Sequence, residues 1–367
     1  MDFHLDEDLT AVRDLAREIL TDRATPDRAR EVERSGTRTD ARLWTDLARA
    51  GLLGIGLPEK HDGAGLGLAG LVVVLVEQGR RVAPVPLWSA GVAAAAVAEH
   101  GSDDQRGRLL PGLADGSARL TLALEEYAGE PDAPECAARP DGAGWTLHGV
   151  KAVVPTPTGV DGVLVSAATP DGTGLFLVDP AAPGVAWQTS AVTTHDLAGE
   201  LRLDGAVAER VGGPESLAPV LATAAVAVAA VQLGVARGAI EIAAAYVSAR
   251  EQFGRPLGTF QALQHQLADC WIDAEAMEVT LWQAVSDLAD GSPAAPRSAL
   301  VAKWWCGQAG LDVVHRVQHV HGGIGVDVDY PVHRYFLWGK QLSSTLGGAG
   351  AALADLGDLL AVTEVRS

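Results

Sequence analysis

The feature that most constrains the fold is a succession of three long helical patterns after Pro214. Apolar residues recur at helical spacing over 215–250, 259–290 and 293–320, and a shorter helix is expected beyond the glycine-rich stretch that follows. Helices of this length bury their apolar faces by packing against one another. The sequence therefore predicts a C-terminal four-helix bundle domain over residues 213–367.

The rest of the chain divides into a helical part and a strand-rich part. Apolar residues recur every three or four positions from Leu9 to Ile19, and the remaining N-terminal helices are predicted at 40–50, 68–80 and 88–100. Short apolar runs then alternate with Pro, Gly and Asp, which is typical of strands and turns; they are Leu120–Leu124, Gly144–Leu147, Gly162–Ala167 and Gly174–Val178. We expect an α+β chain with an all-α domain at 1–116 and a small β-barrel or sandwich at 117–212.

Composition excludes several classes of function. The net charge of −19 argues against binding to nucleic acid or to an anionic membrane. The three cysteines, Cys136, Cys270 and Cys306, have no metal-binding spacing and are expected to be buried, reduced thiols. No apolar leader is visible, and the alanine-rich runs at 91–98 and 222–231 are too short or too weakly apolar to cross a bilayer. These features predict a cytoplasmic protein.

Glycine-rich segments near the two ends of the chain differ in what they indicate. Gly63-Ala-Gly65-Leu-Gly67 is not preceded by a strand and lacks the spacing of a dinucleotide fingerprint, so it is interpreted as a turn. Gly322-Gly323, in contrast, lets backbone N–H groups approach a phosphate where a β-carbon would collide.

Arg250-Glu-Gln252-Phe253-Gly254 supplies the complementary chemistry for a nucleotide. A guanidinium can form two charge-assisted hydrogen bonds to pyrophosphate oxygens, and a phenylalanine ring offers a face to a purine or ribose. Taken singly, Arg250 or Phe253 could equally be a solvated helix residue or a core residue.

As an ordered set, these motifs resemble those of the acyl-CoA dehydrogenase family, and the resemblance covers essentially the whole chain. Pro58-Glu59 and the Gly144-to-Lys151 strand pair are similar to further family motifs. The resemblance implies FAD as cofactor and an acyl-CoA thioester as substrate. It also implies residues that contact the ADP half of a flavin held mainly by the neighbouring subunit: Arg250, Gln252, Phe253, Phe260, Gln261, His319, Gly322 and Gly323.

The family's catalytic base is missing. In the family the flavin removes hydride from the β-carbon while a glutamate takes the α-proton, but the usual glutamate position is Leu346 here. The alternative family position, Ala222–Val226, also has no carboxylate, and Glu241 is interpreted as structural. No catalytic residue is therefore assigned.

The segment that holds the flavin ring has also changed. Family members have T-E-P-x-A-G-S-D where this chain has Leu124-Glu125-Glu126-Tyr127-Ala128-Gly129, and they have W-I-T/S where it has Val153-Val154-Pro155. We therefore predict a non-catalytic subunit that completes the FAD site of a catalytic relative, as in heteromeric actinobacterial acyl-CoA dehydrogenases. The expected assembly is α2β2, with electron-transfer flavoprotein as acceptor and a bulky acyl-CoA ester, such as a steroid side chain, as substrate.

Several alternatives stay open. The chain could be a self-sufficient, homo-oligomeric dehydrogenase with a relocated base among Glu125, Glu126, Asp327 and Asp329. It could instead be a flavin-free scaffold or a family member repurposed for non-redox chemistry. No metal site is expected at the histidines between 315 and 321, and the hydroxyl run at 343–345 has no partner residues for nucleophilic catalysis.

Overall fold

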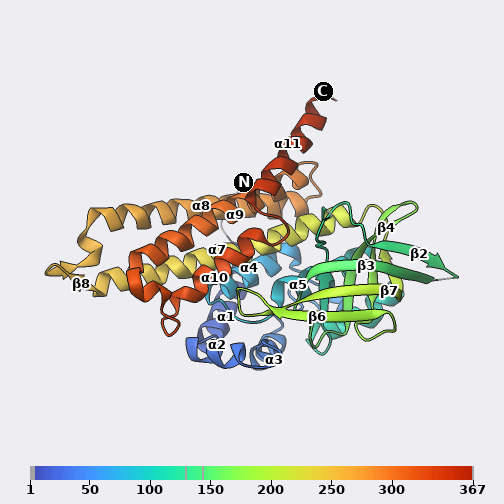
Figure 1. The fold of residues 1–367 in the computed structure, drawn as a ribbon, viewed down its shortest axis with the longest axis horizontal. Helices are drawn as coiled ribbons and strands as arrows, with labels where there is room; N and C mark the ends of the chain where they lie inside the picture. The colour runs from blue at the N-terminus through green and yellow to red at the C-terminus, as the bar shows by residue number, and fades with distance from the viewer. Residues whose placement is uncertain (1–4, 129, 143, 366–367) are drawn as a thin grey trace. The chain divides into compact units, whose positions relative to one another are not determined.

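The computed structural model describes residues 5–128, 130–142 and 144–365 (Figure 1). Helices come first, strands follow, and helices return, which confirms the predicted α+β class. By its contacts the chain forms two compact units: Met1–Pro26 with Val72–Ala83 and Ala225–Ser367, and Asp27–Leu71 with Pro84–Ala224. The domain boundaries predicted at residues 116 and 212 are not the boundaries of these units and remain a prediction.

The N-terminal helices lie where the apolar spacing placed them. They are α1 (Glu7–Arg23), α2 (Pro26–Glu33), α3 (Ala41–Arg49), α4 (Gly67–Arg80), α5 (Leu87–His100) and α6 (Asp103–Ala114). The sequence reasoning did not identify α2 and α6 individually. A capping box marks the start of α6, because Gln105 N donates to Ser102 Oγ and Ser102 N donates to Gln105 Oε1. That Ser-x-x-Gln pattern could have revealed the helix.

The middle of the chain is a closed β-barrel. Its strands are β1 (Leu120–Ala123), β2 (Ala137–Asp141), β3 (Gly144–Pro155), β4 (Gly162–Thr169), β5 (Gly172–Val178), β6 (Val185–Ala191) and β7 (Leu197–Gly212). The pairings β2–β3, β3–β7, β7–β5, β5–β4 and β4–β2 return to their starting strand. Phe176 and Leu201 are fully buried in the core of this barrel.

The strands that the sequence missed have identifiable reasons. In β7 the side chains alternate between buried and exposed from Leu201 onward, but glycines at 199, 205 and 212 give the segment the appearance of turns. The apolar run predicted as a strand ended at Leu147, whereas β3 continues to Pro155. The buried Lys151 lies where a hydropathy pattern would place an apolar residue, so only the family resemblance carried the predicted strand as far as Lys151.

Three long helices and two shorter ones follow the barrel. They are α7 (Leu217–Ala249), α8 (Gln261–Ala289), α9 (Ala295–His321), α10 (Val332–Ser344) and α11 (Ala349–Val365). The first four were predicted, whereas α11 was not. Between α7 and α8 the short strands β8 (Glu251–Gln252) and β9 (Arg255–Pro256) form a hairpin at one end of the two helices (Figure 1).

Helix α7 approaches α4 closely enough to require glycine. A β-carbon on Gly79 would lie 2.0 Å from Val231 O, and one on Gly234 would lie 2.0 Å from Val76 O. The run at 222–231 is part of α7, a longer helix that is long and apolar enough to span a membrane by length and composition, which the run alone did not indicate. However, 67% of its most apolar window is buried within the protein, as in a core helix.

Candidate functional site

The hairpin between α7 and α8 presents an aromatic ring at its tip. Gln252 pairs with Arg255, which leaves Phe253 and Gly254 as a two-residue turn with φ of 55° and 77°. Positive φ at both turn positions suits a type I′ hairpin, but a phenylalanine adopts it only at a cost. The side chain of Phe253 is nevertheless 91% exposed. A strained and exposed aromatic residue of this kind often marks a functional contact.

Cationic and aromatic side chains gather beside this tip. The Phe260 ring lies 6.1 Å from the Phe253 ring in an edge-to-face arrangement, and the Arg255 guanidinium carbon lies 4.1 Å from the Phe260 ring centroid. Arg250 and Arg255 are exposed, and neither forms an ion pair with a carboxylate among the described residues. In a chain with 47 acidic residues, two unpaired arginines on one hairpin are available for an anionic ligand.

The glycine segment after α9 is open. Gly322 has a φ of 63°, and a β-carbon added to Gly322 or Gly323 would have no atom within 4 Å. Gly325 differs, since its β-carbon would lie 2.8 Å from Gln318 O. Packing therefore explains Gly325, whereas the free space at 322 and 323 allows a ligand to reach the backbone.

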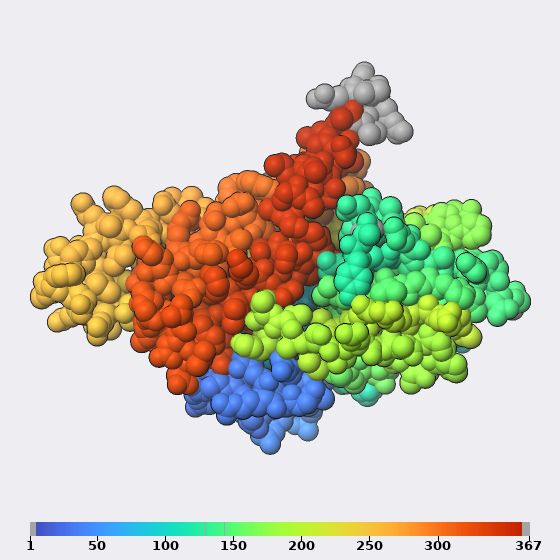
Figure 2. Space-filling view, viewed as in Figure 1, coloured from blue at the N-terminus to red at the C-terminus, as the bar shows by residue number. Residues whose placement is uncertain are grey.

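An aromatic stack brings the hairpin and the glycine segment to the same end of the helices. The His321 ring stacks on Tyr246 at 4.5 Å and lies 5.4 Å from Tyr330. Tyr246 is one turn before Arg250, whose N–H donates to Tyr246 O, and His321 immediately precedes Gly322. In Figure 2 the light-orange residues around the hairpin project from the end of these helices.

His321 itself is a positioning residue. Its Nδ1 lies 2.7 Å from Val317 O, and its buried Nε2 has no hydrogen-bond partner in the described part of the chain. Burial lowers the pKa of His321, against the opposing effect of the Val317 hydrogen bond. Nearby, His319 is exposed and its Nδ1 lies 3.2 Å from Gln266 Oε1, which connects α9 to α8.

The position expected for the catalytic glutamate holds a leucine in a turn. Leu346 follows α10 with a φ of 56°, and the next residue, Gly347, accepts a hydrogen bond from the buried Lys303 Nζ at 2.8 Å. Glu241 forms an ion pair with Arg80, in keeping with its structural interpretation. No proton acceptor is supplied by Leu346.

Comparison with known proteins decides the family. Residues 6–117 match the acyl-CoA dehydrogenase N-terminal domain, and residues 213–355 match the acyl-CoA dehydrogenase C-terminal domain. Acyl-CoA dehydrogenase FadE27 of Mycobacterium tuberculosis is 38% identical over 99% of this chain and 100% of its own length. The chain belongs to the acyl-CoA dehydrogenase family. The predicted resemblance is thereby confirmed, as is membership of a family of flavin-dependent oxidoreductases.

Two solved acyl-CoA dehydrogenase structures share the whole fold. The ChsE4-ChsE5 complex from Mycobacterium tuberculosis matches with a TM-score of 0.94 and 37% identity, over 98% of this chain and 99% of the matched chain. A variant of the Tcur3481-Tcur3483 steroid ACAD matches with a TM-score of 0.96 and 60% identity, over 98% and 99%. Both are complexes of two different proteins by their names, so heteromeric assembly occurs among similar dehydrogenases.

The acids considered as relocated bases are mostly engaged elsewhere. Lys151 Nζ donates to Glu126 Oε1 at 2.6 Å, and the backbone N–H groups of Glu135 and Cys136 donate to the same carboxylate. Asp327 Oδ1 accepts from Asp329 N in an exposed turn. These contacts make Glu126 and Asp327 structural rather than free to take a substrate proton.

The segment expected to hold the flavin ring is bonded within the chain at Tyr127. Tyr127 is 72% exposed, and its hydroxyl donates to Glu200 Oε2 at 2.6 Å, which raises the pKa of Tyr127. Gly129, part of the same predicted segment, lies outside the described residues. The hydroxyls of Ser343, Ser344 and Thr345 donate to backbone carbonyls at the end of α10, so they act as helix-terminal groups.

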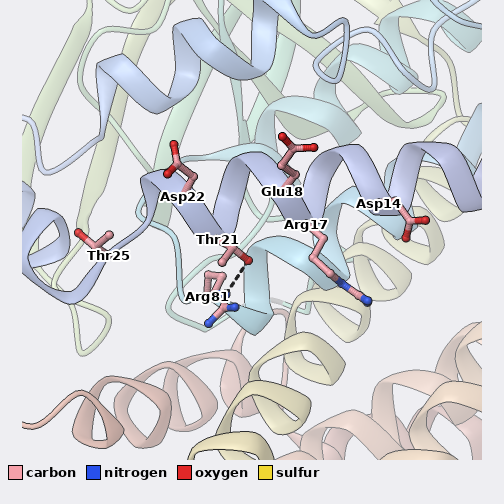
Figure 3. A pocket seen from close by; sticks show the side chains of 7 residues that line it. All are labelled: Asp14, Arg17, Glu18, Thr21, Asp22, Thr25 and Arg81. Atoms are coloured by element: carbon pink, nitrogen blue, oxygen red, sulfur yellow. Dashed lines mark hydrogen bonds between the residues drawn. The ribbon is translucent and has the colours of Figure 1, made fainter.

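Two further observations delimit the site. A pocket of about 810 Å³ lies along α1, where Arg81 Nε donates to Thr21 Oγ1 and Arg17 pairs with Glu77 (Figure 3). None of the predicted nucleotide-binding residues lines it. Across the described ranges there is no group of three or more His, Cys, Asp or Glu side chains that could hold a metal ion. The three cysteines are buried and free, as predicted.

Proposed function

We propose that this chain is the non-catalytic subunit of a heteromeric, flavin-dependent acyl-CoA dehydrogenase. One observation carries the proposal. The residues suited to a nucleotide gather at one end of α7, α8 and α9, where Arg250 is exposed without a carboxylate partner among the described residues and Phe253 is exposed, whereas the position of the catalytic base is Leu346. Such a chain is suited to binding the nucleotide of a flavin that a partner subunit holds, and it lacks the group that removes the substrate proton.

The described residues fit the nucleotide half of FAD. Arg250 supplies charge-assisted hydrogen bonds to phosphate oxygens, and Phe253 and Phe260 supply ring faces or edges to the adenosine part. A β-carbon on Gly322 or Gly323 would have no atom within 4 Å, so a ligand can approach the backbone there, while the Gly322 N–H itself donates to His319 O. Gln252, Gln261 and His319 are exposed and add hydrogen-bonding groups around this centre. When bound, FAD would supply the hydride acceptor of the dehydrogenation.

The partner and substrate follow from the same proposal. The paired names of the ChsE4-ChsE5 and Tcur3481-Tcur3483 relatives support a second dehydrogenase subunit as the partner. The α2β2 stoichiometry and the cytoplasmic location are part of the proposal. The steroid named for the second of them supports a bulky, steroid-derived acyl-CoA as substrate. Electron-transfer flavoprotein would then take the electrons. The catalytic glutamate belongs to the partner, since Leu346 cannot replace it.

The decisive experiment compares the isolated chain with a co-expressed complex. The chain should be purified alone and together with a family member that retains the glutamate, and the ratio of flavin to polypeptide should be measured from absorbance. The complex is expected to be yellow, with fewer flavins than chains, and the isolated chain colourless and inactive. Stoichiometric flavin and acyl-CoA oxidation by the isolated chain would overturn the proposal in favour of a self-sufficient enzyme.

Substitution of Arg250 tests the site itself. Because hydrogen bonds to charged groups contribute roughly 1.5–3 kcal/mol, Arg250→Ala should weaken FAD binding by the complex about 10- to 100-fold. Arg297 is a matched control, since it is an exposed arginine at the start of α9, and Arg297→Ala should leave flavin content unchanged. If the complex forms but Arg250→Ala retains full flavin content, the chain is a scaffold without a role in the flavin site.

A further inference from the structure

We propose that Arg255, which lies outside the residues assigned to the nucleotide, is a second phosphate-binding arginine and is held in position by the Phe260 ring. The inference rests on the proposed function, because the ligand is the pyrophosphate of FAD. It changes the expected role of Phe260, whose ring then supports a guanidinium instead of contacting the nucleotide.

The register of the hairpin places Arg255 on the same face as the assigned residues. Gln252 and Arg255 are directly paired across β8 and β9, and side chains of directly opposed residues lie on one face of a ribbon. Arg250 precedes Gln252 by two positions, and Leu257 N donates to Arg250 O at 2.8 Å, so the pairing continues to Arg250. Side chains two positions apart on a strand share a face. Arg250, Gln252 and Arg255 therefore form one polar row.

The contact with Phe260 explains how Arg255 is held. Its guanidinium carbon lies 4.1 Å from the ring centroid, within the range of a cation–π interaction. Because the guanidinium is planar, stacking occupies one face and leaves its N–H donors free in the plane. Phe260 is itself only partly exposed, and its backbone N–H donates to Leu257 O at 3.0 Å, which fixes the residue at the start of α8.

The charge of the row suits a ligand with two phosphates. Arg250 and Arg255 are both exposed and carry no ion pair within the described ranges. Directly opposed residues in a ribbon are about 5 Å apart, and Gln252 separates the two cations, so one arginine can reach each phosphate of a pyrophosphate. A single phosphate would need only one of them. The row therefore favours a dinucleotide such as FAD over a mononucleotide such as FMN.

The test measures nucleotide binding rather than turnover. FAD should be titrated into the flavin-depleted complex of this chain with its partner. The variants are Arg255→Met, Arg255→Lys, Phe260→Leu and the double variant that combines Arg255→Met with Phe260→Leu. Competition by ADP should be measured at several KCl concentrations, because each direct phosphate contact adds to the salt dependence of binding. Arg297→Met serves as the matched control, and thermal melting checks that every variant is folded.

Arg255→Met is expected to weaken FAD binding and ADP competition about 10-fold, the size of one charged hydrogen bond or a desolvated cation–π contact, and to reduce the salt dependence. Arg255→Lys should keep the salt dependence but lose part of the affinity, since lysine cannot stack as a plane. Phe260→Leu should add little to Arg255→Met, because both remove the same positioned cation.

The outcomes separate this inference from the proposed function. Unchanged FAD binding and salt dependence in Arg255→Met, with binding still weakened in Arg250→Ala, would overturn the role of Arg255 while the proposed function stands. Unchanged binding in both variants would overturn the proposed function. Weakened binding in Arg255→Met with an unchanged salt dependence would show a purely structural role for Arg255 and would also overturn the inference.

Discussion

The hairpin at Glu251–Pro256 and the buried ion pair of Lys151 with Glu126 differ in whether their charged side chains are paired within the chain. Within its own compact unit, the hairpin leaves Arg250 and Arg255 exposed, without carboxylate partners among the described residues. In the β-barrel, the Lys151 and Glu126 side chains are 0% and 6% exposed and lie 2.6 Å apart. Lys151 also donates to Ser166 Oγ at 2.9 Å.

The difference indicates where each region finds its partners. The barrel network is satisfied internally, because Glu126 receives Lys151 and two backbone N–H groups. The exposed arginines of the hairpin have no carboxylate partner among the described residues, so their N–H donors are open to water, a ligand or another subunit. A barrel segment closed by internal hydrogen bonds, beside a hairpin left open, fits the proposed subunit that completes a site in its partner.

The largest change in stability is expected when the hydrogen-bonded network of Lys151 and Glu126 in the barrel is broken. Lys151→Met would leave the Glu126 carboxylate buried without its cation, and breaking a buried pair in this way costs about 3–5 kcal/mol. Hydrogen exchange of the β3 and β4 amides reports this locally, so their opening free energy should fall by that amount. Arg13→Met, which removes an exposed ion pair with Asp14, should change the opening free energy of these amides by less than about 0.5 kcal/mol. A fall below 1 kcal/mol in Lys151→Met would contradict the internal satisfaction of the barrel.

A smaller change in the free energy of unfolding, of opposite sign, is expected from a substitution at the hairpin tip. Phe253 adopts a left-handed backbone and buries little of its ring, so Phe253→Asn should stabilise the isolated chain by roughly 1 kcal/mol, since asparagine tolerates this conformation. Urea denaturation checks the stability, and flavin content of the complex should fall because the ring is lost.

Tyr127→Asn is the matched control for Phe253→Asn. Tyr127 is the exposed aromatic residue of the barrel, and its hydroxyl is bonded to Glu200. Its replacement should slightly destabilise the chain and leave flavin content unchanged. If Phe253→Asn destabilises the chain instead, the strained tip is a structural feature and the contrast between the two regions fails.

The sequence predicted helices better than strands, for physical reasons. The 3.6-residue period persists over many turns in α7, α8 and α9, so their bounds were found within a few residues. Short strands carry fewer repeats, and β7 was hidden by glycines although its apolar side chains alternate. Lys151 misled the reading of β3 because its charge is compensated by Glu126, which is distant in sequence.

The sequence supplied the candidate site as a list of residues, which stays a prediction, but it did not supply their geometry. The order and spacing of Arg250, Phe253 and Gly322 indicated a nucleotide, and these residues do gather at one end of the helices. Arg255 was overlooked, because its significance depends on its pairing with Gln252 and its contact with Phe260. Cross-strand register and ring stacking are tertiary facts that a linear pattern does not contain.

The finest expected effect is a pH dependence from His321, which lies beneath the open glycine segment. Burial lowers its pKa in the folded chain below the 6.5 of the unfolded chain. As pH falls below 6.5, the unfolded state binds a proton that the folded state does not bind, so the free energy of unfolding decreases until the folded pKa is reached.

His321→Phe keeps the stacking on Tyr246 but cannot titrate, and its urea midpoint should therefore fall less than that of the wild type between pH 7 and acidic pH. Replacing the exposed His265 should leave this difference unchanged. Parallel midpoints for wild type and His321→Phe would mean that His321 is solvated, and the aromatic stack would no longer explain how the hairpin and glycine segment are held together.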